Sequence, residues 1–232
     1  MKIMLCLLTS NDSKKLSRLV NSVLDIKPVE GIELKPIIVV NTLKDTYFQE
    51  VLKLELPFPA IRTESNGLPG KGKNSCLDLF LESDCDFVSE VDGDDIIYPS
   101  YLQSLSNHIK HAPCLDVLGV VPTDVINHSV SCGHVIDLPN NTQAGVWGIS
   151  LVTPNKTLGI GPSHIWNEDL PKSVDKIILQ SRKSAEFRMD EELPVAEDHL
   201  YSYQLLGEHQ KGNLLYFLTM SSDLYLVDRT TD

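Results

Sequence analysis

Residues 87–99 read Phe87-Val88-Ser89-Glu90-Val91-Asp92-Gly93-Asp94-Asp95-Ile96-Ile97-Tyr98-Pro99, a short apolar run followed by three carboxylates within four positions. Side chains two residues apart in a strand point to the same side, so Asp92 and Asp94 project together if the strand continues to them. Open α/β sheets bind ligands at the carboxyl ends of their strands. Mg²⁺ and Mn²⁺ prefer oxygen ligands and often share one or two carboxylates with substrate phosphates. The pattern therefore predicts a metal–diphosphate site, with an acidic turn as the alternative.

The sequence before this stretch alternates between strand and helix patterns. Apolar runs predict strands over residues 3–8, 36–40, 60–63 and 86–91, with amphipathic helices between them and another after Pro99. Strands that alternate with helices of roughly 10–15 residues indicate a parallel sheet of βαβ units.

The pattern changes after this alternation. Residues 115–165 are rich in Val, Ile, Thr, Gly and Pro, which favours antiparallel strands and loops. A helix is expected around residues 195–206, and one or two terminal strands over 214–227. The sequence thus predicts an α/β protein whose second half is organised differently from its first.

Composition restricts the classes of partner and compartment. The formal net charge is −12, which disfavours nucleic acid because that affinity depends mainly on Lys and Arg. The five cysteines include no CxxC pair, which favours free thiols in a reducing compartment over a disulfide framework. No segment is apolar for the roughly 18 residues that a transmembrane helix needs, and the apolar run after Met1 is too short for a signal peptide. We expect a cytoplasmic protein without a transmembrane segment.

A second polar stretch, Asn66-Gly67-Leu68-Pro69-Gly70-Lys71-Gly72-Lys73-Asn74-Ser75, precedes an amphipathic helix. Its glycines would let the backbone approach a ligand, while Lys71, Lys73 and the helix N-terminus would supply positive charge for a diphosphate. The stretch nearly matches the phosphate-binding motif GxxxxGK[ST], but Asn74 stands where that motif needs a hydroxyl for Mg²⁺. A true P-loop is therefore disfavoured, and a solvated Gly/Pro loop stays as the alternative to a phosphate contact.

Together these segments resemble the family 2 glycosyltransferases of the GT-A fold, over about residues 1–207. The features that carry the resemblance are the turn Thr9-Ser10-Asn11, the strand Ile37-Ile38-Val39-Val40, the loop from Asn66 to Asn74, the acidic segment Asp92–Leu102 of the form D-x-D-D-x-x-x-P-x-Y-L, and Leu193-Pro194-Val195-Ala196-Glu197-Asp198 before a helix. The chain departs from the family after its second strand, where Asn41-Thr42-Leu43-Lys44-Asp45 replaces the usual Asp-Asp-Gly-Ser. The donor nucleotide is therefore less defined, although Asn41 could still hydrogen-bond a base.

The resemblance implies a GT-A (Rossmann-like) α/β fold, with a mostly parallel central sheet flanked by helices and a mixed or antiparallel C-terminal half. We expect a single domain over residues 1–232. Within it, residues 1–112 would bind the nucleotide sugar, and residues 113–232 would bind the acceptor and carry catalysis.

The resemblance also implies roles for individual residues. Asp94 and Asp92 would hold Mn²⁺ or Mg²⁺ against the donor diphosphate, and Asp198 would act as general base with Glu197 contacting the acceptor or positioning the base. The alternative for this pair is that it complements the dipole of a helix. The remaining candidates are Thr9, Asn11, Asn41, Asn66, Gly67, Lys71 and Lys73 for the donor, Gly161 and Trp166 for the acceptor, and His199 or His209 for the metal.

The expected activity is a metal-dependent, inverting transfer of a sugar from a nucleotide-diphospho sugar to an acceptor hydroxyl. A nucleotidyltransferase is one alternative, although such enzymes place their glycine-rich loop after the first strand, where this chain has Thr9-Ser10-Asn11-Asp12. A catalytically inactive nucleotide- or sugar-binding module is another. The acceptor is open among a glycan, a lipid-linked glycan, a protein and a small molecule, and the net charge argues against modified DNA.

Overall fold

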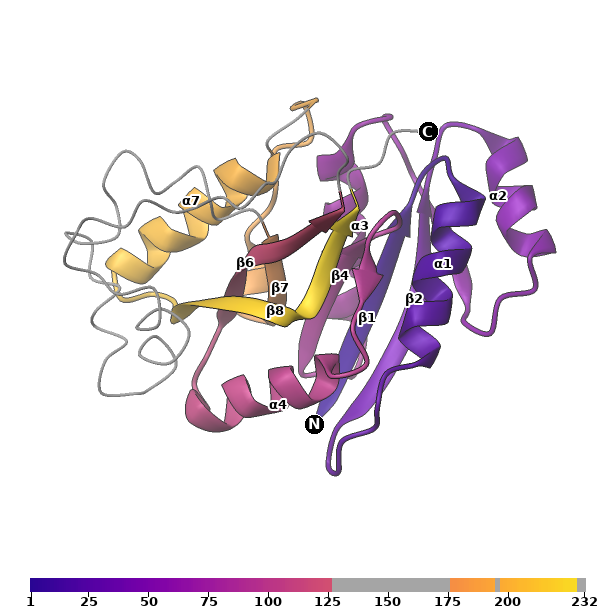
Figure 1. Cartoon of the computed structure of the whole chain (residues 1–232). Helices are drawn as coiled ribbons and strands as arrows, with labels where there is room; N and C mark the ends of the chain where they lie inside the picture. Colours follow the sequence, from indigo (N-terminus) through magenta and orange to yellow (C-terminus); the bar gives the residue numbers. More distant parts are fainter. Residues whose placement is uncertain (127–175, 195–196, 229–232) are drawn as a thin grey trace.

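Strands and helices alternate through the first half of the chain, as the sequence predicts. The computed structural model describes residues 1–126, 176–194 and 197–228 (Figure 1). In chain order the elements are β1 (Lys2–Thr9), α1 (Ser13–Leu24), β2 (Glu33–Asn41), α2 (Asp45–Lys53), β3 (Ala60–Thr63), α3 (Pro69–Glu82), β4 (Phe87–Asp92), β5 (Ile96–Ile97), α4 (Tyr101–His111), β6 (Val117–Ile126), β7 (Lys176–Ser181), the 3₁₀ helix η3 (Ser184–Glu186), α7 (Glu197–Gln210) and β8 (Tyr216–Asp228).

The described strands form one eight-stranded sheet in the order β3-β2-β1-β4-β7-β6-β8-β5. The strands β3, β2, β1 and β4 are mutually parallel, which is the sheet that the βαβ pattern predicts. The strand β7 runs antiparallel to both β4 and β6, whereas β6 and β8 are parallel and β5 is antiparallel to β8. The predicted fold class, a mostly parallel α/β sheet that becomes mixed in the C-terminal half, is confirmed.

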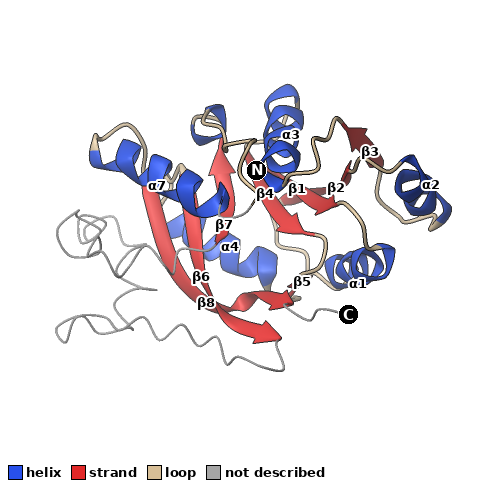
Figure 2. Cartoon of the chain, turned by 90° about the horizontal axis from the view of Figure 1, so that it is seen from above, coloured by secondary structure: helices blue, strands red, loops and turns tan. Residues whose placement is uncertain are grey.

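Both faces of the sheet are covered by helices, and alternate side chains of β1 enter the two cores. Ile3, Leu5 and Leu7 pack in the core under α1, α2 and α4. Met4 and Cys6 pack in the other core, which includes residues of α3 and α7. Figure 2 shows α3 and α1 on opposite sides of β1. A strand with helices on both faces buries every side chain, which is why residues 3–7 are continuously apolar.

The helix α3 begins earlier than the sequence predicts. The stretch through Gly72 was expected to be a loop, but the helix starts at Pro69, and proline fits a first turn whose N–H groups have no helical partner. A Cβ on Gly70 would lie 2.2 Å from the carbonyl oxygen of Asp190. A Cβ on Gly72 would lie 3.0 Å from Cγ of Asn41. These glycines therefore allow a helix to pack closely, and they do not form a flexible loop.

The acidic segment also differs from the simplest expectation. The strand β4 ends at Asp92, so Asp94 lies in a turn, in which the amide of Asp95 donates to the carbonyl of Asp92 at 3.0 Å. The next helix begins at Tyr101, with Ser100 as its N-cap. Asp95 is buried beside the turn.

Four cysteines fall in the described residues, and all are free thiols. Cys6, Cys76 and Cys85 are buried and Cys114 is exposed, whereas Cys132 lies outside the described residues. Over the same ranges, no helix combines the length and apolar character needed to cross a bilayer.

Candidate functional site

The carboxyl ends of β1, β2 and β4 meet at one edge of the sheet and open into a cleft of about 770 Å³. The first turns of α3 and α7 complete its lining. Nine of the residues that the sequence singles out line this cleft, namely Thr9, Asn11, Asn41, Gly67, Lys73, Asp92, Asp94, Glu197 and Asp198. The cleft occupies the edge at which open α/β sheets bind their ligands.

The acidic turn is held in place by its backbone. The guanidinium of Arg18, from α1, donates to the carbonyl oxygen of Asp94 at 2.8 Å. A Cβ on Gly93 would lie 2.7 Å from the carbonyl of Leu8, so only glycine lets the turn pass this close to the end of β1. The fixed backbone places both Asp92 and Asp94 on the cleft.

The chemistry of this turn fits a hard divalent cation shared with a ligand. Within the described ranges, no group of three or more His, Cys, Asp or Glu side chains is placed to hold a metal. The carboxylates of Asp92 and Asp94 are the oxygen donors that such a cation would use, with a bound ligand supplying the others. Mg²⁺ is commonly bound in this way, with substrate phosphates completing the coordination.

The carboxylate pair Glu197 and Asp198 occupies the first turn of α7. Lys73, from the second turn of α3, lies with its Nζ 2.7 Å from Oε1 of Glu197 and 3.8 Å from Oδ2 of Asp198. The side chain of Glu197 is 6% exposed and that of Asp198 is 24% exposed. Of the two carboxylates, Asp198 is therefore the more accessible to a ligand in the cleft.

The polar residues at and just after the end of β1 have three different tasks: Thr9 contacts α2, Asp12 caps α1, and Asn11 lines the cleft. The hydroxyl of Thr9 hydrogen-bonds that of Tyr47, whose pKa is raised chiefly by burial. Asp12 is the N-cap of α1, because its Oδ1 accepts from the amides of Lys14 and Lys15 at 3.0 and 2.9 Å. Asn11 lines the cleft and does not serve as the cap.

The amide of Asn41 joins β2 to the segment that follows β3. Its Nδ2 donates to Oγ1 of Thr63 at 3.1 Å and to the carbonyl of Glu64 at 2.8 Å. Its Oδ1 accepts from the hydroxyl of Ser65 at 2.9 Å. Asn41 borders the cleft, but this set of contacts gives its side chain a structural task that the sequence did not indicate.

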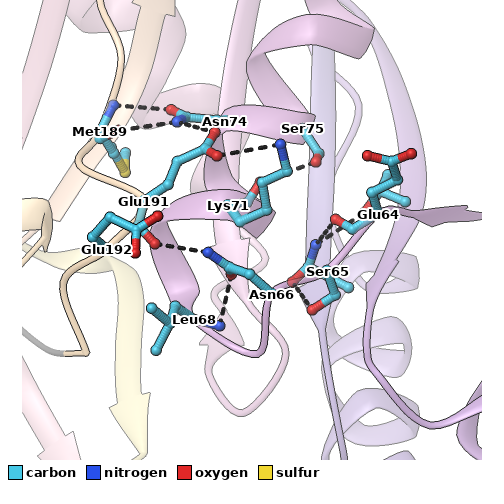
Figure 3. Close-up of polar contacts among 12 residues, drawn as sticks. Glu64, Ser65, Asn66, Leu68, Lys71, Asn74, Ser75, Met189, Glu191 and Glu192 are labelled. Atoms are coloured by element: carbon cyan, nitrogen blue, oxygen red, sulfur yellow. Dashed lines mark hydrogen bonds and ion pairs between the residues drawn. The ribbon is translucent and has the colours of Figure 1, made fainter.

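Two of the predicted donor contacts point elsewhere. Asn66 donates to the carbonyl of Glu191 at 2.8 Å and accepts from the amide of Leu68 at 3.0 Å (Figure 3). Lys71 lies with its Nζ 3.2 Å from Oε2 of Glu191. Neither Asn66 nor Lys71 is among the residues that line the cleft.

Asn74 is a residue whose role sequence reasoning missed. It is buried, and its amide pairs with both backbone polar groups of Met189 and with the carboxylate of Glu191 (Figure 3). The hydrogen bond from Asn74, and then Lys71, lower the pKa of Glu191. The sequence signal was the position of Asn74 at the end of the glycine-bearing motif, where GxxxxGK[ST] has a metal-binding hydroxyl. That position did not indicate a contact with Met189 or Glu191.

The remaining candidates do not join the cleft in the described part of the chain. Gly161 and Trp166, the expected acceptor contacts, lie outside the described residues, as does the side chain of His199. His209 lies near the end of α7, with Nδ1 3.0 Å from the carbonyl oxygen of Leu214 and not on the cleft. His209 therefore contacts the backbone after α7 and does not lie beside Asp94 in the cleft.

Comparison with known proteins identifies the fold. No protein-family model matches the chain, and a search of curated proteins finds no match. Among solved structures, S. aureus TarS aligns with 98% of this chain at a TM-score of 0.65 and 20% identity. The TarS fragment 1–349 in complex with UDP-GlcNAc aligns with 100% of this chain, at a TM-score of 0.66 and 20% identity. The same fragment in complex with UDP aligns with 99% of this chain, at a TM-score of 0.63 and 20% identity.

This chain spans 37% of the longer TarS chain and 60–61% of the fragment. The likeness establishes that this chain has the α/β fold of these TarS structures, which is GT-A-like.

Proposed function

We propose that this protein is a metal-dependent glycosyltransferase that moves a sugar from a nucleotide-diphospho sugar to an acceptor hydroxyl, with inversion at the anomeric carbon. The observation that carries the proposal is that one cleft contains Asp92 and Asp94 at the end of β4 together with Asp198 at the start of α7. The GT-A-like fold supports it, because TarS structures of the same fold hold UDP-GlcNAc and UDP.

The donor would occupy the sheet side of the cleft. Thr9, Asn11 and Asn41 border the region at the ends of β1 and β2 that would take the nucleoside. Leu68 and Pro69 bring the N-terminus of α3 to the cleft, and a helix N-terminus favours an anion such as a diphosphate. A Mn²⁺ or Mg²⁺ ion held by Asp94 and Asp92 would neutralise the charge that develops on the departing diphosphate.

Asp198 would act on the acceptor. Its carboxylate would take the proton of the acceptor hydroxyl while that oxygen forms a bond to the anomeric carbon. The bond from the anomeric carbon to the diphosphate oxygen breaks in the same step, and its electron pair leaves with the nucleoside diphosphate. Attack opposite the leaving group inverts the anomeric configuration. Gly161 and Trp166 stay as predicted acceptor contacts.

The alternatives fit the site less well. A nucleotidyltransferase normally places a glycine-rich loop after its first strand, whereas β1 here leads through Asp12 directly into α1. Gly70 and Gly72, in contrast, lie in a helix that packs against other parts of the chain. An inactive binding module would bind a nucleotide sugar without turnover, so only an assay of product release distinguishes it.

The proposal is tested by a thermal-shift screen of UDP, GDP, CDP and TDP, each with Mn²⁺ and with EDTA. UDP comes first because the TarS complexes contain UDP and UDP-GlcNAc. A ligand at about 100 times its Kd stabilises a protein by about 2.7 kcal/mol, which raises the melting temperature measurably. We expect stabilisation by one diphosphate that is lost with EDTA and with Asp94→Ala, followed by release of that diphosphate from its sugar conjugate. No stabilisation by any of the four would refute the proposal.

A further inference from the structure

Lys73 has an unusual environment for a lysine. Its side chain is only 10% exposed, although lysines are almost never fully buried unless they are paired. Its partner at 2.7 Å, Glu197, is still more buried, and the second carboxylate, Asp198, lies at 3.8 Å. The contact joins residues 124 positions apart in the sequence, and so it connects the second turn of α3 to the first turn of α7.

The helix that carries Lys73 is itself attached to the chain just before α7. The amide of Asn74 accepts from the backbone N–H of Met189 at 2.9 Å and donates to the Met189 carbonyl at 3.0 Å. It also donates to Oε1 of Glu191 at 2.9 Å, and Asn66 donates to the Glu191 carbonyl (Figure 3). The anchor formed by Asn66 and Asn74 thus fixes residues 189–191, and Lys73 fixes the first turn of the helix that follows.

We propose that Lys73 is a positioning residue, which holds Glu197 and thereby sets the place of Asp198, and that it is not a ligand of the donor diphosphate. This inference rests on the proposed function, and it replaces the phosphate contact that the sequence suggested for Lys73. The ammonium is within hydrogen-bonding distance of Glu197 but not of Asp198, so it orients the first turn of α7 without donating to the Asp198 carboxylate.

The balance of charge in the cleft supports this assignment. An ammonium that is paired with Glu197 and close to Asp198 adds little net positive potential for an anionic ligand. The N-terminus of α3 and a cation on Asp94 are better placed to balance the charge of a diphosphate.

The test compares Lys73→Met and Lys73→Arg with the wild type in three measurements. These are UDP affinity by calorimetry with Mn²⁺, kcat for UDP release from a UDP-sugar, and hydrogen exchange of the amides of residues 201–204. Those amides donate to the carbonyls of residues 197–200 in α-helical geometry, so their exchange reports whether the first turn of α7 is held. Lys53→Met, at an exposed lysine at the end of α2, controls for the substitution itself.

In the double variant Lys73→Met/Glu197→Gln, which removes the ammonium and its partner carboxylate together, we expect UDP affinity to change by less than about threefold. The single variant Lys73→Met is used for turnover and exchange. We expect kcat to fall by about 100-fold, because a misplaced catalytic group loses its alignment. Exchange at residues 201–204 should become about tenfold faster, and Lys73→Arg should restore both exchange and most of kcat.

Since Lys73→Met leaves Glu197 buried without this partner, the double variant Lys73→Met/Glu197→Gln provides a second test. It removes both charges together, and we expect it to fold and to bind UDP but to keep the low kcat.

Opposite results would overturn the inference. A loss of UDP affinity of about tenfold or more in Lys73→Met/Glu197→Gln, with unchanged exchange at residues 201–204 in Lys73→Met, would make Lys73 a diphosphate ligand. If the wild type neither binds nor releases any of the nucleotides, the proposed function fails, and the exchange comparison still decides the inference. Faster exchange in Lys73→Met that is absent from Lys73→Arg would then support the inference that Lys73 positions the first turn of α7. Unchanged exchange in Lys73→Met would refute it.

Discussion

Alanine at Gly70 should destabilise the protein, whereas alanine at Gly207 should stabilise it. The Cβ of an alanine at position 70 would lie 2.2 Å from the carbonyl oxygen of Asp190, far inside van der Waals contact. Its distance to Cα of Glu191 would be 3.4 Å, which is an ordinary van der Waals distance. Either α3 or residues 190–191 must therefore move by roughly 1 Å. Nothing lies within 4 Å of a Cβ on Gly207, in α7, so that position is the matched control.

The magnitude follows from three contributions. Overpacking costs about 1–3 kcal/mol, and the displaced backbone weakens the hydrogen bonds that Asn74 makes to Met189, each contributing about 1 kcal/mol. The helical preference of alanine over glycine offsets up to about 1 kcal/mol. We expect Gly70→Ala to lose about 2 kcal/mol of unfolding free energy, and Gly207→Ala to gain about 0.5–1 kcal/mol.

Urea unfolding followed by circular dichroism measures both changes, with a slope that should stay constant if only stability changes. For a chain of this size, the loss in Gly70→Ala corresponds to a melting temperature about 4–8 °C lower. Suppose that Gly70→Ala is as stable as the wild type while Gly207→Ala shows the expected gain in unfolding free energy. The inference that α3 packs closely against Asp190 would then be refuted.

Three further predictions concern the site and its anchor. Asp198→Asn should lower kcat by about 10²–10⁴ while leaving UDP affinity by calorimetry unchanged, and retained turnover would exclude Asp198 as the base. Asn74→Ala should cost about 2–4 kcal/mol in urea unfolding, because the buried backbone groups of Met189 lose their partner, and a cost below about 0.5 kcal/mol would contradict this. Glu191 has a pKa lowered by Asn74 and then Lys71, so its ionised form stabilises the protein above its ordinary pKa of 4.5, and this contribution is lost as pH falls through the lowered folded pKa. The stability advantage of the wild type over Glu191→Gln should therefore shrink as pH is lowered from neutral to about 3, and a difference independent of pH would count against the contact.

The parallel half of the fold was predictable because its signals are local. Five successive apolar residues from Ile3 predict a strand covered on both faces, and the structure buries them in two cores. The repeat of Leu16, Leu19, Val20, Val23 and Leu24 predicts one apolar helix face. In α1 the first four are buried, whereas Leu24, the last residue of the helix, is exposed. Short-range periodicity is sufficient for such elements, because it depends only on which side of each element faces the sheet.

The boundaries of elements near the site were less predictable. Glycines and a proline between Asn66 and Gly72 suggested a loop, since these residues commonly mark turns. Gly67 does have the positive φ of a turn glycine, at +83°. Gly70 is instead required by the closeness of Asp190, more than a hundred positions further along the chain, and Gly72 by the closeness of Asn41. A glycine needed for a turn and a glycine needed for close packing look the same in a single sequence.

The sequence by itself determined the alternation of strands and helices, the acidic turn at the end of β4 and, by resemblance, the set of residues around the cleft. Only the tertiary structure decided which of the predicted polar residues line the cleft and which hold distant segments of the chain together. Lys73 faces Glu197, while Asn66, Lys71 and Asn74 hold the chain at Met189 and Glu191. Helix and strand propensities act over a few neighbouring residues, whereas the partner of a buried polar group is set by which distant segments the packed sheet brings together. A lysine next to a glycine-bearing helix start could bind a phosphate or a carboxylate, and the three-dimensional position of α7 brings a carboxylate within 2.7 Å of Lys73.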